Sequence, residues 1–385
     1  MRSVLEILEH EGCWEEPALK AFAARNRVDV RRHGPLALLD YQEDILIDQW
    51  NDFNRQCRGL IVDLESRSLV AWPFDKFFNL GQHPETAREA LPAGSAYEMA
   101  LKYDGSMLTG FVHGGQVRFA TRSSFDNVQT RVAGEVASRR YGGLRQVDMG
   151  RYTPVFELVG PDNVVTVRYE DTDLMLIGVR DREARRMLGY AETASFAAQH
   201  GLRPAERVEG DLEALIRQSR EGAGDFHEGW VVRFDTGLYV KVKTWQYLAH
   251  VQAQRMGLGR KRLVERYCRA SGDEWRRFVA ALPPRAQQAV ASFGDELQAR
   301  LLAFCAEVDA LHARFAHLES QKDYSLAIQA NAPRNMHTFL FARRAGRPLE
   351  PIVRARWTDV GALDQGDEIV TPAMIREWAL ARTDL

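Results

Sequence analysis

The chain has 385 residues and a formal net charge of −2, so its overall charge does not favour a nucleic-acid partner. Hydrophobic residues make up 45% and charged residues 27%, as in an ordinary globular protein. No stretch reaches the roughly eighteen uncharged apolar residues of a membrane span, so we expect a cytoplasmic protein with no membrane partner. The length favours two domains over one.

The four cysteines are scattered at positions 13, 57, 268 and 305, without a Cys-x-x-Cys pair. This spacing is typical of neither a disulfide framework nor a zinc site. We therefore expect free thiols in a reducing compartment.

Between about Arg58 and Lys243, short β patterns alternate with turns. The expected strands lie in RGLIVDLESRSLVAWPF, LTGFVHGGQVRFATR, TPVFELVG, VVTVRYE, LMLIGVR and GWVVRFDTGLYVKVK. The glycine pair in VHGGQV predicts a hairpin. NVQTRVAGEVASRRY and YAETASFAAQHG predict helices, the second ending at Gly201. Strands mixed with helices in this way predict an α+β fold with antiparallel sheets.

Beyond Trp245 the β pattern disappears and helical patterns take over. Apolar residues at spacings of three and four predict one stripe on a long helix: Leu297, Leu301, Phe304, Val308, Leu311, Phe315 and Leu318. Pro283 and Pro284 should divide the helical region. We expect a boundary near residues 244–254, with one domain over 1–245 and an all-α domain over 246–385.

The stretch KYDGS, which begins at Lys102, is the first chemically suggestive motif. One interpretation is a surface turn at Asp104 and Gly105 beside a solvated lysine. The other is a nucleophilic lysine at a strand end, with Gly105 allowing the backbone to approach a phosphate.

Further charged residues follow in strand-like segments. Glu157 lies in FELVG and Glu228 precedes an apolar strand in EGWVV, each without a basic residue two positions away. A buried carboxylate without a partner would be costly. Lys241 and Lys243 lie two apart on an expected strand and so share a face, which favours an anion such as a polyphosphate between them.

Taken in order, KYDGS, FELVG, EGWVV and KVK resemble motifs I, III, IV and V of the covalent nucleotidyltransferases, which include DNA and RNA ligases and capping enzymes. CRGLIVD and FDKFFNLGQHPE upstream are most similar to the T4 RNA ligase 1 family. The resemblance covers about residues 55–250 and implies an adenylyltransferase domain of antiparallel sheets with flanking helices. Helical patterns after motif V fit this family better than the β-rich domain of DNA ligases and capping enzymes.

The resemblance implies that Lys102 attacks ATP and holds AMP, while Asp104 orients the lysine. A free lysine has a pKa of about 10.4, so we expect nearby cations, Lys241 and Lys243 with a divalent metal, to lower it. These lysines would also stabilise charge on the phosphates.

The remaining site residues are also implied by the resemblance. Arg58, Lys76 and, more weakly, Arg122 would contact the nucleotide, although salt bridges or solvated charges are the alternatives. Glu157 would bind the ribose and Glu228 would hold Mg²⁺ or Mn²⁺, with Glu157 as a second candidate metal ligand. The aromatic residue often found before motif IV is absent, and Ile177 and Val179 lie there instead.

The function implied is an ATP-dependent RNA ligase that joins 5′-phosphate and 3′-hydroxyl RNA ends through lysyl-AMP, in RNA repair and alongside an end-healing kinase or phosphatase. The alternatives are a DNA-end-joining ligase and an inactive nucleotide- or RNA-binding relative. The basic stretch 255–269 is either an RNA-contacting surface or a solvated helix face.

Overall fold

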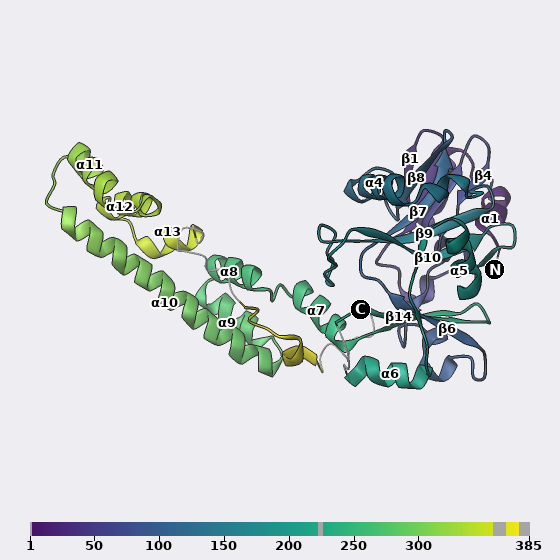
Figure 1. The fold of residues 1–385 in the computed structure, drawn as a ribbon. Coiled ribbons are helices and arrows are strands. Elements are labelled where there is room, and N and C mark those ends of the chain that lie inside the picture. Colours follow the sequence, from purple (N-terminus) through teal and green to yellow (C-terminus); the bar gives the residue numbers. More distant parts are fainter. Residues whose placement is uncertain (1, 222–225, 357–366, 377–385) are drawn as a thin grey trace. The chain divides into compact units, whose positions relative to one another are not determined.

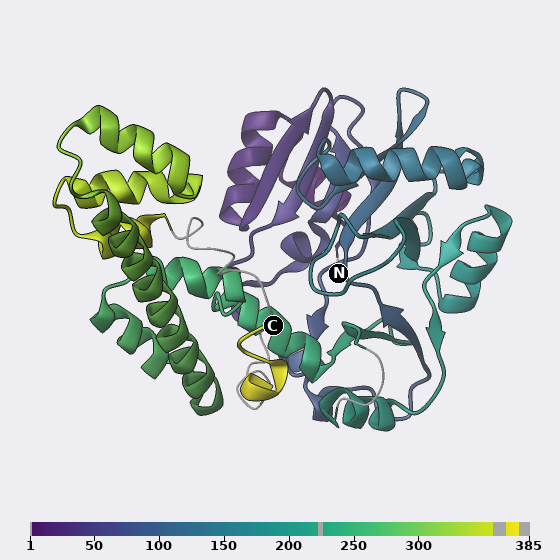
Figure 2. The ribbon, with the colours of Figure 1, turned by 60° about the vertical axis from the view of Figure 1, so that its left-hand side comes forward.

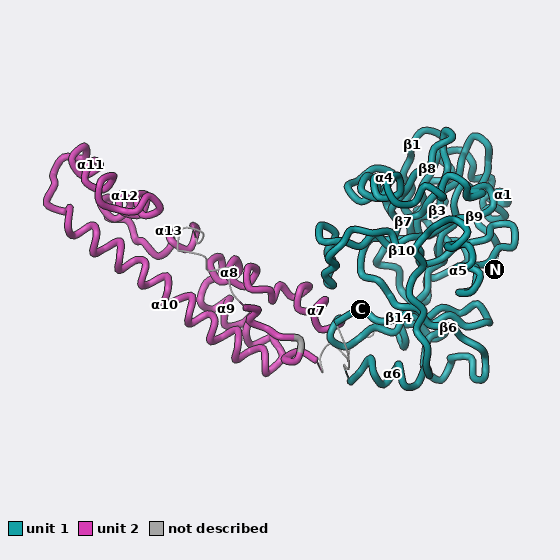
Figure 3. Tube along the Cα trace, in the orientation of Figure 1, with its two compact units in different colours: residues 1–247, 383–385 teal, residues 248–382 magenta. Residues whose placement is uncertain are grey.

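The computed structural model describes residues 2–221, 226–356 and 367–376. These residues divide into two compact units, the first running to Tyr247 and the second beginning at Leu248 (Figure 3). The division falls inside the stretch 244–254, where the sequence pattern changes from β to helical. The separate roles expected for residues 1–245 and 246–385 stay a prediction.

The described part of the first unit contains three β-sheets, with helices packed against them (Figure 1). The first sheet is antiparallel, in the order β1 (Val28–His33), β2 (Leu36–Tyr41), β3 (Arg58–Asp63) and β4 (Ser68–Ala71). The second has the order β11 (Arg186–Met187), β10 (Asp173–Asp181), β9 (Tyr152–Val159), β7 (Ser106–His113) and β8 (Gln116–Thr121), with β12 (Arg203–Pro204) parallel to β10. The third has the order β13 (Arg207–Val208), β6 (Tyr97–Lys102), β14 (Gly229–Phe234), β15 (Tyr239–Lys243) and β5 (Phe78–Asn79).

Helices cover one face of each sheet. α1 (Val4–His10) and α2 (Glu16–Arg25) pack on the first sheet, as the purple segments of Figure 2 show, and α3 (Asp52–Gln56) leads into β3. α4 (Val128–Arg140) and α5 (Tyr190–Gln199) pack on the second sheet, and α6 (Leu212–Glu221) packs on the third. The fold of this unit is therefore α+β with mainly antiparallel sheets, as the sequence predicted.

The second unit is described as a set of helices. They are α7 (Trp245–Arg255), which begins in the first unit, α8 (Arg260–Arg269), α9 (Gly272–Ala280), α10 (Pro284–Phe315), α11 (Gln321–Asn331), α12 (His337–Arg344) and α13 (Leu349–Ala355). The predicted stripe buries Leu297, Leu301, Phe304 and Val308 along α10, and α10 begins at Pro284, where the break was expected. Leu318 lies beyond the end of α10. No described helix is long and apolar enough to cross a membrane.

Most predicted local features of the first unit are confirmed. Gly114 and Gly115, with φ of +60° and +73°, join β7 to β8 in the expected hairpin. α4 and α5 lie where the helical patterns predicted them, and Gly201 follows α5 with φ of +60°.

One expected strand was wrong, because residues 164–170, VVTVRYE, form a loop. The backbone N–H groups of Thr166 and Val167 donate to the carboxylate of Asp104 instead of to a neighbouring strand. Val164 and Val165 are exposed, so the β-branched residues that suggested a buried strand do not pack in the core.

The third sheet requires a glycine where β14 begins. Gly229 has a φ of +142°, and a Cβ there would overlap the carbonyl oxygen of Val242 on β15. β14 lies between β6 and β15, so a displacement at Gly229 disturbs both neighbours.

We predict that Gly229→Ala destabilises the protein by roughly 3 kcal/mol, through overlap and backbone strain, as measured by thermal unfolding. Gly134→Ala is the matched control, because Gly134 lies in α4 with open space around its Cα and should gain about 0.5–1 kcal/mol. Equal melting temperatures for Gly229→Ala and the unaltered protein would contradict the packing described.

Candidate active site

Three neighbouring strands present one face of the third sheet in aligned rows. The rows are Lys102, Gly229 and Lys243; then Ala100, Val231 and Lys241; then Glu98, Arg233 and Tyr239. Because side chains alternate along a strand, these residues share one face, and the opposite face packs on α6. The register therefore places Lys102 and Lys243 at one end of the face and Lys241 beside the apolar residues Ala100 and Val231 in its middle.

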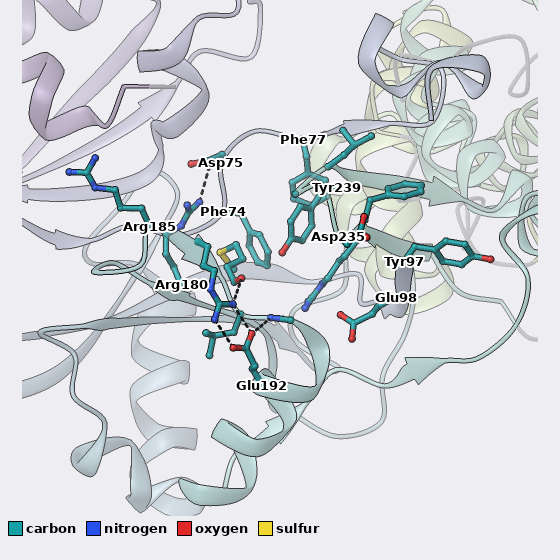
Figure 4. A pocket seen from close by; sticks show the side chains of 18 of the residues that line it. Phe74, Asp75, Phe77, Tyr97, Glu98, Arg180, Arg185, Glu192, Asp235 and Tyr239 are labelled. Carbon is teal, nitrogen blue, oxygen red and sulfur yellow. Dashed lines mark hydrogen bonds and ion pairs between the residues drawn. The ribbon is translucent and has the colours of Figure 1, made fainter. Parts of the chain in front are cut away.

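A narrow cavity of about 50 Å³ lies over this face, and it adjoins a larger one of about 710 Å³. Its walls come from all three sheets and include Arg58, Phe74, Phe77, Ala100, Lys102, Glu157, Ile177, Val231, Arg233 and Lys241. The larger cavity shares Phe74, Phe77 and Arg233 with it, and Figure 4 shows Phe74, Phe77 and Tyr239 gathered there. Four of the residues expected from the sequence, Arg58, Lys102, Glu157 and Lys241, thus line one cavity.

Glu228 bridges two lysines at the first row. Its Oε2 accepts a hydrogen bond from Lys102 Nζ at 2.6 Å, and its Oε1 lies 3.3 Å from Lys243 Nζ. Glu228 directly precedes Gly229, which lies between the two lysines in the register. The partners of this buried carboxylate therefore come from neighbouring strands and not from its own.

Lys241 and Lys243 do not lower the pKa of Lys102 below its ordinary value, so this part of the expectation was wrong. Burial alone would lower the pKa, but the carboxylates of Glu228 and Glu157 outweigh it and hold the pKa of Lys102 above its ordinary value. Lys102 is consequently held in its protonated, non-nucleophilic form by the residue beside it.

The lowered pKa that was expected for Lys102 is found at Lys241 and Lys243 instead. Burial, followed by the charge of Arg58 and other neighbouring cations, holds the pKa of Lys241 well below its usual range. Burial also lowers the pKa of Lys243, although Glu228 opposes this. Lys241 Nζ donates to the carbonyl of Phe77 at 3.1 Å, so the two lysines that share a face have different acceptors.

Glu157 approaches the same site from the second sheet. Burial raises its pKa to about 7, against the opposing charge of Lys102. Its Oε1 accepts a hydrogen bond from the backbone N–H of Gly105 at 3.1 Å. Glu157 and Glu228 therefore provide two buried carboxylates near the lysine.

Arg58 carries donors that the described residues leave unused. Its Nε and Nη1 are buried without a hydrogen-bond partner among those residues, and its guanidinium lies 5.1 Å from the centre of the Phe77 ring. A buried charged donor without an acceptor is costly, so the arrangement suits an anionic ligand.

Lys76 lies among aromatic rings instead of in solvent. Its Nζ is 5.0 Å from the ring centres of Tyr41 and Phe78 and 5.1 Å from that of Trp50. Burial lowers the pKa of Lys76. It lines the larger cavity and not the narrow one, and Phe78 is a core residue.

Asp104 is engaged away from the lysine. Its Oδ1 accepts from the Tyr247 hydroxyl at 2.8 Å, and its Oδ2 accepts from the N–H groups of Thr166 and Val167 at 2.7 Å each. Its own N–H donates to the Tyr169 hydroxyl at 3.0 Å. Asp104 thus ties the loop 160–172 and the start of α7 to the strand end that bears Lys102. Sequence analysis missed both tyrosines, which no motif marks.

The structure gives a different reason for the glycine after Asp104. A Cβ at Gly105 would overlap the carbonyl oxygen of Leu158 on β9, so the close approach that requires glycine is to a strand. The Gly105 N–H is already donated to Glu157.

Arg122 is neutralised by a neighbour. Its Nε and Nη2 donate to the two oxygens of the buried Asp40 at 3.1 and 3.2 Å, and its guanidinium lies 4.4 Å from the centre of the Tyr41 ring. Arg122 does not line either cavity described above, so the structure does not bring it to Lys102. These contacts agree with the alternative interpretation from the sequence, in which Arg122 forms a salt bridge.

A β-bulge turns Ile177 toward the narrow cavity. The pairing of β10 with β9 shifts between Leu176 and Gly178, which leaves Ile177 without a partner in the register. Ile177 lines the cavity, whereas Val179 is packed in the core of the second sheet. The sequence pattern could not separate these two residues.

We predict that Glu157→Gln gains stability relative to the unaltered protein as the pH rises. A carboxyl with a raised pKa binds protons more readily in the folded state, so the unaltered protein loses stability between pH 4.5 and about 7, and glutamine does not. The difference in unfolding free energy should grow by on the order of 3 kcal/mol across this range. A difference that stays constant with pH would contradict the raised pKa.

We predict that Asp104→Ala speeds hydrogen exchange at the amides of Thr166 and Val167 by at least about tenfold, because both lose a charged acceptor. Asp162→Ala, an exposed change in the same loop, is the control and should leave these two amides unaffected. Unchanged exchange in Asp104→Ala would show that the carboxylate does not hold the loop.

The sequence is similar to known RNA ligases mainly along the first unit. A candidate RNA ligase from Thermovibrio ammonificans is 33% identical over 247 residues, which cover 61% of this chain and 63% of that protein. RNA ligase 1 of bacteriophage TS2126 is 29% identical over 204 residues, which cover 50% of this chain and 51% of that protein. The chain thus spans between half and two thirds of the length of these relatives.

Solved structures of RNA ligases are also similar, at lower levels. An archaeal ATP-dependent RNA ligase aligns with a TM-score of 0.48 and 14% identity, over 92% of this chain and 82% of its own. A Naegleria gruberi RNA ligase with pyrophosphate aligns with a TM-score of 0.33 and 18% identity, over 40% of this chain and 51% of its own. Because both TM-scores are below 0.5, the family assignment rests on the sequence. The profile of the RNA ligase family of the T4 RNA ligase 1 type matches residues 56–249, half of the chain, and the protein therefore belongs to that family.

Proposed function

We propose that the protein is an ATP-dependent RNA ligase that joins 5′-phosphate and 3′-hydroxyl RNA ends through a lysyl-AMP intermediate on Lys102. The observation that carries the proposal is the position of Lys102 at a strand end, near two buried carboxylates and in the same cavity as Arg58, whose Nε and Nη1 have no partner among the described residues. Family membership supports the class of reaction.

The first proposed step forms a bond between Lys102 Nζ and the α-phosphorus of ATP, breaks the α–β phosphoanhydride bond and releases pyrophosphate. Nζ must give up a proton before it attacks, and Glu228 Oε2, at 2.6 Å, is in place to accept it. Arg58, Lys241 and Lys243 would stabilise the negative charge that develops on the phosphates. The narrow cavity of about 50 Å³ and the larger one of about 710 Å³, which share Phe74, Phe77 and Arg233, together offer the space for the nucleotide.

Two later steps complete the proposed ligation. An oxygen of the RNA 5′-phosphate displaces Lys102 from the adenylate, and a 3′-hydroxyl then displaces AMP to form the phosphodiester. The protein contributes mainly position and charge stabilisation in both steps. Ends of other chemistry would first need a kinase or phosphatase.

Glu228 and Glu157 are the residues that would hold a divalent metal, Mg²⁺ or Mn²⁺. Among the described residues no three His, Cys, Asp or Glu side chains form a metal-binding group, so a dedicated cage is not what they offer. Two carboxylates do fit Mg²⁺, which usually keeps waters and binds substrate phosphates. When bound, the metal would neutralise phosphate charge.

We further propose that residues 246–385 form an all-α domain that contacts RNA. Lys261, Arg262, Arg266 and Arg269 are exposed on α8, and among the described residues only Arg262 of these four forms an ion pair, with Glu265. Each RNA phosphate that these residues neutralise should steepen the slope of the logarithm of the binding constant against the logarithm of salt concentration by about one unit.

We predict that the protein incubated with divalent metal and ATP labelled at the α-phosphate carries the label through a denaturing gel, and that Lys102→Ala carries none. Pyrophosphate treatment beforehand removes AMP already bound. Lys322→Ala, a change in the second unit, is the control and should label normally. Absence of label on the treated, unaltered protein would contradict the proposal.

The acceptor is tested with nicked or broken strands that carry ribose or deoxyribose at the 3′-terminal side of the break. An RNA ligase should require the 2′-hydroxyl there, because that group distinguishes RNA from DNA. Equal joining of both strands would favour a DNA-end-joining ligase instead.

A further inference from the structure

Arg233 is the second buried guanidinium with unused donors at this site. It lies in the third row of the sheet face, is 7% exposed, and lines both the narrow and the larger cavity. We propose that Arg233 reads the base of the bound nucleotide and selects adenine over guanine. This inference rests on the proposed function, since it assumes a nucleotide with its α-phosphate at Lys102.

The contacts of Arg233 leave two of its donor nitrogens without an acceptor among the described residues. Its Nη2 donates to the carbonyl of Ile177 at 2.6 Å, which joins the third sheet to the bulge of the second. Its Nε and Nη1 are buried without a partner among the described residues. A buried, charged donor in this state is costly, so a ligand acceptor is the group that the site lacks.

The surroundings of Arg233 favour a neutral polar ligand over an anion. In the register Arg233 lies between Glu98 and Tyr239, so a carboxylate is its neighbour on one side. Figure 4 shows Glu98 and Tyr239 at the same cavity. An anion held by Arg233 would be repelled by Glu98, whereas a group with both acceptors and donors would not.

Other arginines of the larger cavity already have carboxylate partners. Arg180 Nη2 lies 3.0 Å from Asp75, and Arg186 Nη2 lies 2.6 Å from Glu192. Arg233 has no ion-pair partner among the described residues. Arg233 therefore differs from Arg180 and Arg186 in keeping buried donor nitrogens without a partner among the described residues.

The position of Arg233 along the sheet matches the far edge of a nucleotide. Two rows, or four residues, separate Arg233 from the row of Lys102, a distance of about 13 Å along a strand. In the middle row Ala100 and Val231 lie beside Lys241, and with Ile177 of the second sheet these two residues give the cavity an apolar slot. A nucleotide with its α-phosphate at the first row would place its base in this slot and the edge of the base at Arg233.

The hydrogen-bond chemistry at this edge favours adenine. Adenine presents N1, an acceptor, to the Arg233 donors, and its 6-amino group can donate to the Ile177 carbonyl or the Glu98 carboxylate. Guanine presents a donor at N1 and an acceptor at O6, so donors would face donors and acceptors would face acceptors. A site built on buried polar groups rejects such a mismatch strongly.

The test compares lysine adenylylation with ATP and with 1-deaza-ATP, which has carbon in place of N1 and keeps the 6-amino group. The unaltered protein should use ATP with a kcat/KM about 10- to 100-fold higher. In Arg233→Met the two nucleotides should react within about twofold of each other, because the donors are gone. GTP should gain relative to ATP in the same variant.

Arg186→Met is the matched control, because this arginine lines the larger cavity but is paired with Glu192, and it should keep the preference of the unaltered protein. If Arg233 has only a structural role, Arg233→Met would lower kcat/KM equally for ATP and for 1-deaza-ATP and leave the ratio of the two values unchanged. That result would overturn the proposal. If Arg233→Met does not fold, equal use of ATP and 1-deaza-ATP by the unaltered protein would overturn it alone.

Failure of the proposed function is distinguishable from failure of this inference. If no nucleotide labels Lys102, the ligase proposal fails, and equilibrium binding of ATP and 1-deaza-ATP then tests Arg233 directly. Tighter binding of ATP that is lost in Arg233→Met would support the inference, and equal binding by the unaltered protein would contradict it.

Discussion

The bridge from Glu228 to Lys102 and Lys243 is the interaction on which the rest of the site depends. It exists because β14 lies between β6 and β15, in a register that sets Gly229 opposite both lysines. The glycine leaves room for neighbouring backbone, and the buried carboxylate before it satisfies two ammonium groups. The same pairing holds Lys102 in its protonated form, so the proposed attack of Lys102 on ATP requires that Glu228 releases Lys102 or accepts its proton.

Two basic residues at the cavity, Lys241 and Arg58, are placed where an anion would stabilise their charge. Lys241 has a strongly lowered pKa, and Arg58 keeps buried donors without an acceptor. Both features are costly without a ligand and would be relieved by an anion, since phosphate oxygens accept hydrogen bonds and favour the charged form of lysine. The cost of holding this arrangement is offset by the three helix-covered sheet cores around it.

The sequence alone was sufficient for the motifs and for the order of most strands and helices after Arg58, because hairpin glycines and strand patterns are local signals. It was not sufficient for contacts that depend on register. One of the two lysine partners of Glu228 lies 126 residues away, the Asp104 carboxylate binds Tyr247 and a loop expected to be a strand, and Arg122 pairs with Asp40. The direction of the Lys102 pKa shift was mispredicted for the same reason, since lysines are visible in the sequence and their distances to carboxylates are not.

Glu228 holds Lys102 in its protonated form through the hydrogen bond between Lys102 Nζ and Glu228 Oε2. The most direct measurement is the titration of the Lys102 side chain by NMR, in protein labelled at the lysine ε position, with and without Glu228→Gln. We expect a Lys102 pKa above the ordinary lysine value of about 10.4, and we expect it to fall when the carboxylate is removed. A Lys102 pKa already below that value with Glu228 intact, and unchanged in the glutamine variant, would contradict this expectation.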